Sequence, residues 1–433
     1  MKKATISGIV AALFIIFSCS GKRTVAEHDP SGSGDGKPTG VVQMDPGTNH
    51  ENVMKMLKNM NDLSLGLYKK LSSENADQNL AFSPASLNMA MAIVYSGARG
   101  NTKQQMSNVF GFDQDHDTFH PLYHAYMTEI LNIGKDTLTD FNLANRVFLE
   151  QSYPVLDEFV DQVMNWHGGA FEKTDFRNFP LQAENRINSW VEEQTRNRIR
   201  DLIPTGSLDD LTRLVLVNAL YIKSDWKYPF NKELTREKDF RLPSGATMRT
   251  DFMNQRKEGI PWFENEDFIA IELPYTTPDL SLLMIRPNRE VVENISNYVP
   301  DGETYRHIIE NLRNEEVIIE IPSYKIESTF SLVEPLRNAG LTDAFDFHAD
   351  LSGISGERDL EISDILQKVF FEIDEEGSEA AAATAIVIVT TSVAFDPEPK
   401  LPKRFNADRP FLFILKENRF QTPLFIGQFT GNE

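Results

Sequence analysis

Residues 375–399 read EEGSEAAAATAIVIVTTSVAFDPEP, and this stretch decides how the rest of the chain is interpreted. Its sixteen residues from 380 to 395 carry no charge. Four alanines come first, and the run 386–389 is strongly strand-forming. An exposed loop of this composition would be an aggregation hazard. One interpretation is therefore an ordinary buried strand that follows an alanine-rich turn.

Alternation within the same stretch favours a second interpretation. Every second residue from Ser378 is uncharged, and those near Gly377 are mostly small. The set is Ser378, Ala380, Ala382, Thr384, Ile386 and Ile388. Because successive side chains of a strand point to opposite faces, this set could enter a crowded sheet interior.

The flanking sequence predicts helices first and strands later. Helical spacing or start and stop signals occur at 53–67, 84–97 and 187–199. Apolar runs predict strands at 214–222, 269–273, 280–285, 317–321, 369–373, 411–415 and 424–429, the first of them buried on both faces. Separate blocks of helices and strands favour an α+β fold with large mixed or antiparallel sheets. No linker rich in Gly, Pro or Ser interrupts residues 49–433, so we expect a single domain there.

Composition excludes several classes of function. The 433 residues include 64 acidic and 43 basic side chains, which gives a net charge of −21. Nucleic-acid binding depends on Lys and Arg, so we expect no nucleic-acid partner. The single cysteine excludes a disulfide framework and cysteine-rich zinc modules.

The first 48 residues predict export rather than folded structure. Residues 1–18 have the basic start and apolar run of a signal peptide, and the run is short for a membrane span. Cys19 follows directly, within a stretch that resembles a loose bacterial lipobox, so lipidation of Cys19 is expected. An ordinary secretory signal with an incidental cysteine is the alternative. Residues 19–48 then form a flexible tether rich in Gly and Ser. We expect a lipid anchor on a bacterial cell envelope, in the outer membrane, with a secreted or periplasmic protein as the alternative.

Several motifs together resemble the serpin family. The segment EEGSEAAAA at 375–383 looks like the hinge of an inhibitory serpin's reactive-centre loop. Further matches, in family order, are NLAFSPAS at 79–86, VNALYI at 217–222 with Trp226 and Pro229-Phe230, LPY at 273–275, DLSGI at 350–354, FNADRPFLFIL at 405–415 and TPLFIG at 422–427. Each is weak alone, but together they cover nearly all of residues 50–433.

The resemblance implies a serpin fold with an exposed reactive-centre loop at about 377–399, and a suicide inhibitor of serine proteases. The loop would be cleaved and would insert into a sheet before the acyl-enzyme is hydrolysed. The hinge would comprise Glu376, Gly377, Ser378, Glu379, Ala380, Ala381, Ala382 and Ala383. Gly377 can adopt unusual backbone angles, and Ser378 is the first inward residue, where a buried charge would oppose entry.

The family's loop length places the reactive bond at Thr391-Ser392, with Val389 and Thr390 as alternatives. No Lys or Arg occurs between Gly377 and Pro399, so trypsin-like enzymes should find no site there. Elastase-like or subtilisin-like serine proteases are the expected partners, with papain-like cysteine proteases as further candidates. We expect a monomer, and no cofactor or metal.

The resemblance also implies a group of polar residues that controls opening of the sheet, called the shutter and breach. These are Ser83, Ser86, Asn218, Trp226 and Gln367. The position of Gln367 is often His in the family. We expect Gln367 to bond Ser83, Ser86 and Asn218 with different chemistry.

Other candidate sites carry less weight. His116, His120 and His124 stand four residues apart, but Pro121 argues against one continuous helix, so we interpret them as a solvated polar face rather than a metal site. No nucleophile elbow, zinc-protease motif or phosphate loop occurs, so no enzyme is expected. A non-inhibitory serpin that binds a partner, and a surface adhesin that only uses the fold, remain as alternatives.

Overall fold

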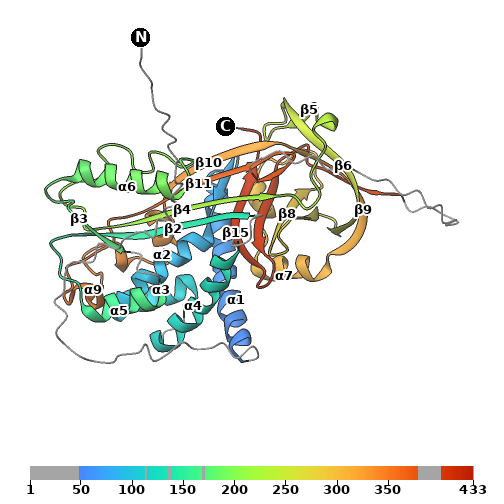
Figure 1. Ribbon diagram of the computed structural model, residues 1–433. Coiled ribbons are helices and arrows are strands. Elements are labelled where there is room, and N and C mark those ends of the chain that lie inside the picture. The colour runs from blue at the N-terminus through green and yellow to red at the C-terminus, as the bar shows by residue number, and fades with distance from the viewer. Residues whose placement is uncertain (1–47, 113–114, 134–138, 168–170, 379–400, 433) are drawn as a thin grey trace, which may run out of the picture. The chain divides into compact units, whose positions relative to one another are not determined.

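The computed structural model describes residues 48–112, 115–133, 139–167, 171–378 and 401–432 (Figure 1). The predicted signal peptide, Cys19 and most of the tether lie outside these residues, as does the loop from Glu379 to Lys400. No helix in the described ranges is both long enough and apolar enough to span a membrane.

Helices dominate the first part of the described chain and strands the second. The α-helices are α1 (Thr48–Glu74), α2 (Pro84–Gly97), α3 (Gly100–Phe110), α4 (His116–Asn132), α5 (Asp157–Trp166), α6 (Pro180–Gln194), α7 (Gly302–Asn311), α8 (Val333–Asn338) and α9 (Ser352–Ser355). The strands are β1 (Leu80–Phe82), β2 (Thr139–Glu150), β3 (Phe171–Thr174), β4 (Leu214–Asp225), β5 (Arg236–Arg241), β6 (Thr247–Glu264), β7 (Phe268–Pro274), β8 (Leu280–Pro287), β9 (Arg313–Pro322), β10 (Tyr324–Ser331), β11 (Asp364–Ile373), β12 (Gly377–Ser378), β13 (Lys403–Asn406), β14 (Phe411–Glu417) and β15 (Thr422–Phe429).

A mixed six-stranded sheet carries the features that matter for function. Its order is β10-β11-β4-β2-β3, and the short β12 pairs with β4. The pairs β10–β11 and β2–β4 are antiparallel, whereas β11 and β4 run parallel, from Asp364 opposite Val215 to Val369 opposite Leu220. Because β4 lies inside this sheet, its run of apolar residues is buried on both faces, as predicted.

Two apolar clusters cover the two faces of the six-stranded sheet. Leu214 and Leu216 of β4 belong to the main core, which α2 also enters. Val215 and Val217 point the other way, into a smaller cluster that Trp190 of α6 closes. Figure 1 shows α6 over one face of this sheet and α2 on the opposite side. Any new strand in this sheet must therefore bury both of its faces.

The second sheet has nine strands, in the order β1-β15-β14-β8-β7-β6-β9-β13, with β5 paired to β6. The C-terminal segments 405–415 and 422–427 contribute to β13, β14 and β15. All residues of β8, β14 and β15 are buried. The sequence motifs at the C-terminus therefore form the apolar centre of the fold.

The α+β class and the predicted strands are confirmed by this topology. Two expectations need correction. Helix α6 ends at Gln194, so Ile199 lies beyond it. Strands β2 and β3 also interrupt the helical part. Strand β6 was not predicted, because consecutive charges at 256–258 and a register shift between Lys257 and Ile260 break its alternation.

Candidate functional site

The chain reverses direction between β11 and β12, at one end of the six-stranded sheet. After β11 it turns through Asp374 and returns antiparallel to β4, with Gly377 opposite Asp225 and Ser378 opposite Ser224. Further along β4, β11 itself is the neighbouring strand. At this end of the sheet, Gly377 and Ser378 of the hinge therefore lie beside β4. Farther from the hinge, β4 pairs directly with β11 and no space remains between them. We call the position between β4 and β11 the slot.

Gly377 is required by its close approach to β4. A Cβ atom at this position would lie 2.2 Å from the Ser224 carbonyl oxygen, far inside contact distance. Any other residue would push β12 away from β4.

Ser378 is the first side chain of the hinge that faces the core, as the alternation predicts. It is 2% exposed, and its Oγ lies 2.7 Å from the hydroxyl oxygen of Tyr275. Burial raises the pKa of Tyr275, so its hydroxyl keeps its proton and can donate or accept. The sequence did not assign Tyr275 a role, although it belongs to one of the matched motifs.

Trp226 fixes the turn that leads into the hinge. Its backbone N–H donates to the Glu376 carbonyl oxygen at 2.7 Å, and its indole Nε1 donates to the Asp374 carbonyl oxygen at 2.9 Å. The indole also stacks on Tyr275, with ring centroids 4.5 Å apart. The carboxylate of Asp374 accepts from the N–H groups of Glu376 and Gly377, at 2.8 and 3.1 Å.

The turn between β11 and β12 carries several acidic side chains, and neighbouring residues offset part of their negative charge. Lys232 Nζ donates to Glu376 at 2.6 Å, and the hydroxyl of Thr235 donates to Glu375. Burial raises the pKa of Asp374 and of Asp225, and the neighbouring carboxylates add to the effect. The hinge end of the slot thus carries unfavourable charge, although Lys232 offsets part of it.

The residues predicted for the shutter lie together where α2 begins beneath the sheet. Gln367 accepts from Ser83 N–H and donates to the Ser83 carbonyl oxygen, both at 2.9 Å. Ser83 Oγ donates to the Leu424 carbonyl oxygen and caps α2. Gln367 therefore joins β11 to the residue that caps α2, and Ser83 in turn joins that cap to β15.

A second set of bonds joins α2 to β4 and β2. Ser86 Oγ donates to Asn145 at 2.8 Å and approaches the Asn218 side-chain oxygen at 3.4 Å. The expectation that Gln367 bonds Ser83 is confirmed, whereas its expected bonds to Ser86 and Asn218 are not found, because Ser86 turns its hydroxyl to Asn145 and Asn218. Asn145 was missed, although it lies directly opposite Asn218 in the sheet.

Asn218 has one unsatisfied atom. Its side chain is fully buried, and its Nδ2 has no hydrogen-bond partner among the described residues. A buried donor without a partner costs about 1–3 kcal/mol. Midway along β4, Asn218 therefore presents a buried donor that a new neighbouring strand could satisfy.

The remaining predicted site residues lie outside the described part of the chain. They are Glu379, Ala380, Ala381, Ala382, Ala383, Val389, Thr390, Thr391, Ser392 and Cys19. The structure thus places the start of the hinge and the shutter and breach residues, and leaves the reactive bond and the lipid as predictions.

The interpretation of the histidines as a solvated face is wrong. Helix α4 runs through Pro121, and His120 is 1% exposed, with its Nδ1 3.1 Å from Nε2 of His167. Burial lowers the pKa of His120 to about 2 and that of His167 to about 3. Within the described ranges, no group of three or more His, Cys, Asp or Glu side chains could hold a metal ion.

Comparisons with known proteins agree on one family. The family model described as "Serpin (serine protease inhibitor)" matches residues 58–431. Human Serpin B3 is 34% identical over 375 residues, which cover 83% of this chain and 95% of that protein. The human leukocyte elastase inhibitor is 35% identical and is covered completely, by 87% of this chain. The crystal structure of Serpin48 from the insect Tenebrio molitor superposes with a TM-score of 0.75 at 30% identity, and covers 88% of this chain and 99% of that one. The family match, the shared fold and the hinge beside β4 lead to one conclusion: the chain belongs to the serpin family.

Proposed function

We propose that the protein is a suicide inhibitor of serine proteases that works by loop cleavage, trapping of the acyl-enzyme and insertion of the loop into the six-stranded sheet. Serpins are protease inhibitors and not enzymes. The observation that carries the proposal is the position of Gly377 and Ser378, which already pair with β4 at the open end of the slot.

The chemistry needs only the protease's own nucleophile. Its serine attacks the carbonyl carbon of Thr391, an ester forms, and the amino group of Ser392 leaves with the C-terminal fragment. The released loop end is then free to follow Ser378 into the slot, with the protease still attached to Thr391.

The register of the hinge sets how far insertion goes. Ile388 comes ten residues after Ser378, and Leu214 comes ten residues before Ser224, so continued antiparallel pairing brings Ile388 opposite Leu214. Leu214 is the first residue of β4. Residues 377–388 therefore match the whole length of β4.

Insertion replaces one short set of hydrogen bonds between strands β4 and β11 with two longer sets, one on each side of the inserted strand. The parallel pairing of Asp364–Val369 with Val215–Leu220 is lost, and the new strand pairs antiparallel with both β4 and β11. Each additional ladder bond contributes about 0.5–1.5 kcal/mol net, so the exchange favours insertion by on the order of 10 kcal/mol.

The loop sequence fits both faces of the slot. In the continued register Ala383, Ala385 and Val387 stand beside Ala219, Val217 and Val215, which are buried under α6. Small and β-branched residues can pass beneath a helix that already covers the sheet.

Thr384 falls opposite Asn218 in the same register. Its hydroxyl can then accept from Asn218 Nδ2, the buried donor that has no partner before insertion. Satisfying that donor adds about 1–3 kcal/mol to the driving force.

The proposed targets are elastase-like and subtilisin-like serine proteases, and also papain-like cysteine proteases. Thr391, with Val389 and Thr390 as alternatives, suits shallow apolar pockets. A similar protein named leukocyte elastase inhibitor supports this choice.

The test is to mix the chain with pancreatic elastase, subtilisin and papain, and with trypsin as control. An SDS-stable complex with the first two, and none with trypsin, supports inhibition. Clean cleavage with a large rise in melting temperature but no complex favours the alternative, a non-inhibitory serpin that binds a partner. Cleavage without any rise contradicts insertion itself.

We also propose that lipidated Cys19 anchors the protein to a bacterial cell envelope, in the outer membrane. The support is the position of Cys19 directly after the apolar run of the signal peptide. In bacterial expression the unaltered chain should partition into detergent and a Cys19→Ser variant should not. Equal partitioning of both would contradict lipidation.

A further inference from the structure

We propose that the chain binds a small amphipathic carboxylate in an apolar pocket beside the shutter, and that the bound ligand restrains opening of the slot. The pocket has a volume of about 220 Å³ and lies between α1, α2 and α3. Its apolar lining comes from Leu63, Leu67, Phe82, Leu87, Val109 and Phe110. Binding does not depend on the proposed inhibitory function, whereas the restraint on the slot rests on it.

Gly66 leaves the pocket open in the middle of α1. Glycine within a helix is destabilising relative to alanine, and a close approach of another segment is the usual reason for it. That reason does not apply here, because a Cβ atom at Gly66 would meet nothing within 4 Å. The missing side chain therefore leaves a space that a larger residue would fill.

The dimensions of the pocket fit a ligand of about eight carbon atoms. An apolar cavity of about 150 Å³ accommodates benzene, so a pocket of about 220 Å³ has room for a longer apolar body. Leu63 and Lys70 are about two helical turns apart on α1, which sets a length of about 10 Å. Leu63 is 37% exposed, so the pocket is open to solvent on this side.

The charged groups at the rim favour a carboxylate. Asp62 is already ion-paired with Arg306 of α7, whereas Lys70 has no ion pair within the part of the chain that the structure describes. The buried polar side chains in the wall bond each other, with Asn88 Nδ2 donating to Ser64 Oγ at 3.4 Å. The ammonium of Lys70 is therefore the polar group that can bind a carboxylate while the apolar body of the ligand lies inside.

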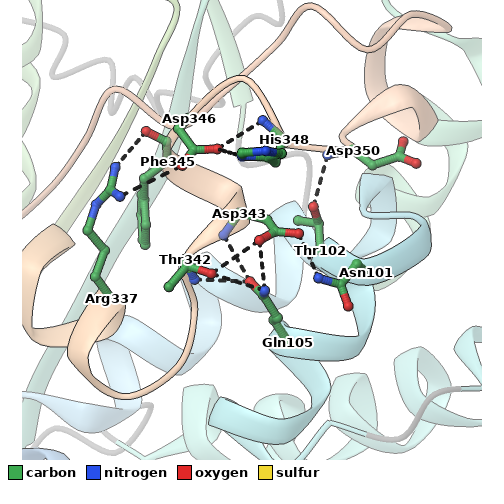
Figure 2. A network of polar contacts seen from close by, with 10 residues as sticks. All are labelled: Asn101, Thr102, Gln105, Arg337, Thr342, Asp343, Phe345, Asp346, His348 and Asp350. Atoms are coloured by element: carbon green, nitrogen blue, oxygen red, sulfur yellow. Dashed lines mark hydrogen bonds and ion pairs between the residues drawn. The ribbon is translucent and has the colours of Figure 1, made fainter.

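The wall formed by α3 and Ala339 is held in place by polar contacts (Figure 2). Gln105 stands one turn before Val109 on α3, and it accepts from the N–H groups of Thr342 and Asp343 at 3.0 and 2.9 Å. These bonds fix the segment that follows Ala339 against α3. Because the wall is formed before a ligand arrives, binding costs less entropy.

Two residues of the pocket are direct neighbours of the shutter. Phe82 precedes Ser83, which is bonded to β11 through Gln367, and Leu87 follows Ser86, which contacts β4. Since insertion separates β11 from β4, the start of α2 cannot keep both sets of contacts. A ligand packed against Phe82 and Leu87 favours the arrangement in which both are intact, which is the closed slot.

The binding test uses octanoate and its uncharged analogue octan-1-ol in titration calorimetry. The unaltered chain should bind octanoate at one site with a dissociation constant of about 0.1–1 mM, and octanoate should raise the melting temperature of the uncleaved chain. Lys70→Gln should weaken octanoate binding about five- to tenfold and leave octan-1-ol binding unchanged. Lys69→Gln is the matched control, because Lys69 is exposed and does not line the pocket, and it should weaken neither ligand.

Gly66→Leu should fill the pocket. Leucine is a good helix former and has space at this position, so the variant should melt no lower than the unaltered chain without ligand. It should bind neither octanoate nor octan-1-ol. A large fall in its melting temperature would contradict the open space above Gly66.

Titration of pancreatic elastase tests the restraint on the slot. Saturating octanoate should raise the number of inhibitor molecules consumed per elastase inactivated at least about twofold for the unaltered chain. The number for Gly66→Leu should not change, which also controls for an effect of octanoate on elastase.

The outcomes separate the two parts of the proposal. No saturable binding of octanoate, or equal binding by Gly66→Leu, overturns the site. Binding with an unchanged number of inhibitor molecules per elastase overturns the restraint. Absence of any covalent complex with the ligand-free chain overturns the proposed inhibitory function, and calorimetry then decides the binding site by itself.

Discussion

Ser378→Arg should convert the inhibitor into a substrate. Ser378 is almost completely buried beside β4, and its hydroxyl is bonded to Tyr275. Arginine would bring an unpaired cation to the first inward position of the slot, where the hydrogen bond to Tyr275 would also be lost. Together these effects cost about 3–5 kcal/mol.

Because residue 378 already pairs with β4 before cleavage, arginine should hold the hinge out of the slot, and its burial cost then falls on the first step of insertion. Because about 1.4 kcal/mol is a factor of ten in rate, entry should slow by about 10²- to 4 × 10³-fold. Hydrolysis of the acyl-enzyme then overtakes insertion, and the number of inhibitor molecules consumed per elastase inactivated should rise by a similar factor.

The assay titrates elastase with each variant and follows residual activity and SDS-stable complex. Ser378→Ala is the matched control, because it also loses the Tyr275 bond but stays small and uncharged. It should remain an inhibitor with a stoichiometry close to that of the unaltered chain. Complexes from Ser378→Arg in the amounts given by Ser378→Ala would refute the reasoning.

Three further predictions concern individual polar side chains. Thr384→Val should leave Asn218 without a partner after insertion, so calorimetry should show a smaller melting-temperature rise on cleavage; an unchanged rise contradicts that pairing. Gln367→Ala should remove two bonds to Ser83 and destabilise the uncleaved chain by about 1–3 kcal/mol in denaturant titration, and equal stability would contradict its role. The pKa of buried His120 is about 2, below the usual value near 6.5, so the unfolded chain binds more protons and stability present above pH 6.5 is lost as pH falls below it. His120→Phe should flatten this acid limb of the unfolding profile, and an unchanged slope would exclude His120 as its source.

Local sequence was enough for much of the fold. The apolar runs at 214–222 and 411–415 have no charge to expose, so they predict buried strands, and both are found. Strand β6 was missed because the consecutive charges at 256–258 and a register shift between Lys257 and Ile260 break the alternation. Pro121 was overweighted, since α4 continues through it.

The candidate site was only partly predictable. Alternation from Ser378 identified the inward face, because the period of a strand is fixed. The bonds of Tyr275 and Asn145 depend on pairing between distant segments, which no local pattern encodes. For the same reason only one of the three partners predicted for Gln367 is right: it bonds Ser83, but not Ser86 or Asn218.

The most direct test of the inhibitory mechanism is the intact mass of the denatured product formed with pancreatic elastase. We predict a species equal to the chain that ends at Thr391 plus one elastase joined by an ester, together with a released peptide that begins at Ser392. A peptide beginning at Thr390 or Thr391 would move the bond to an alternative position. Free elastase with two fragments of the chain, and no covalent species at any ratio, would contradict the mechanism.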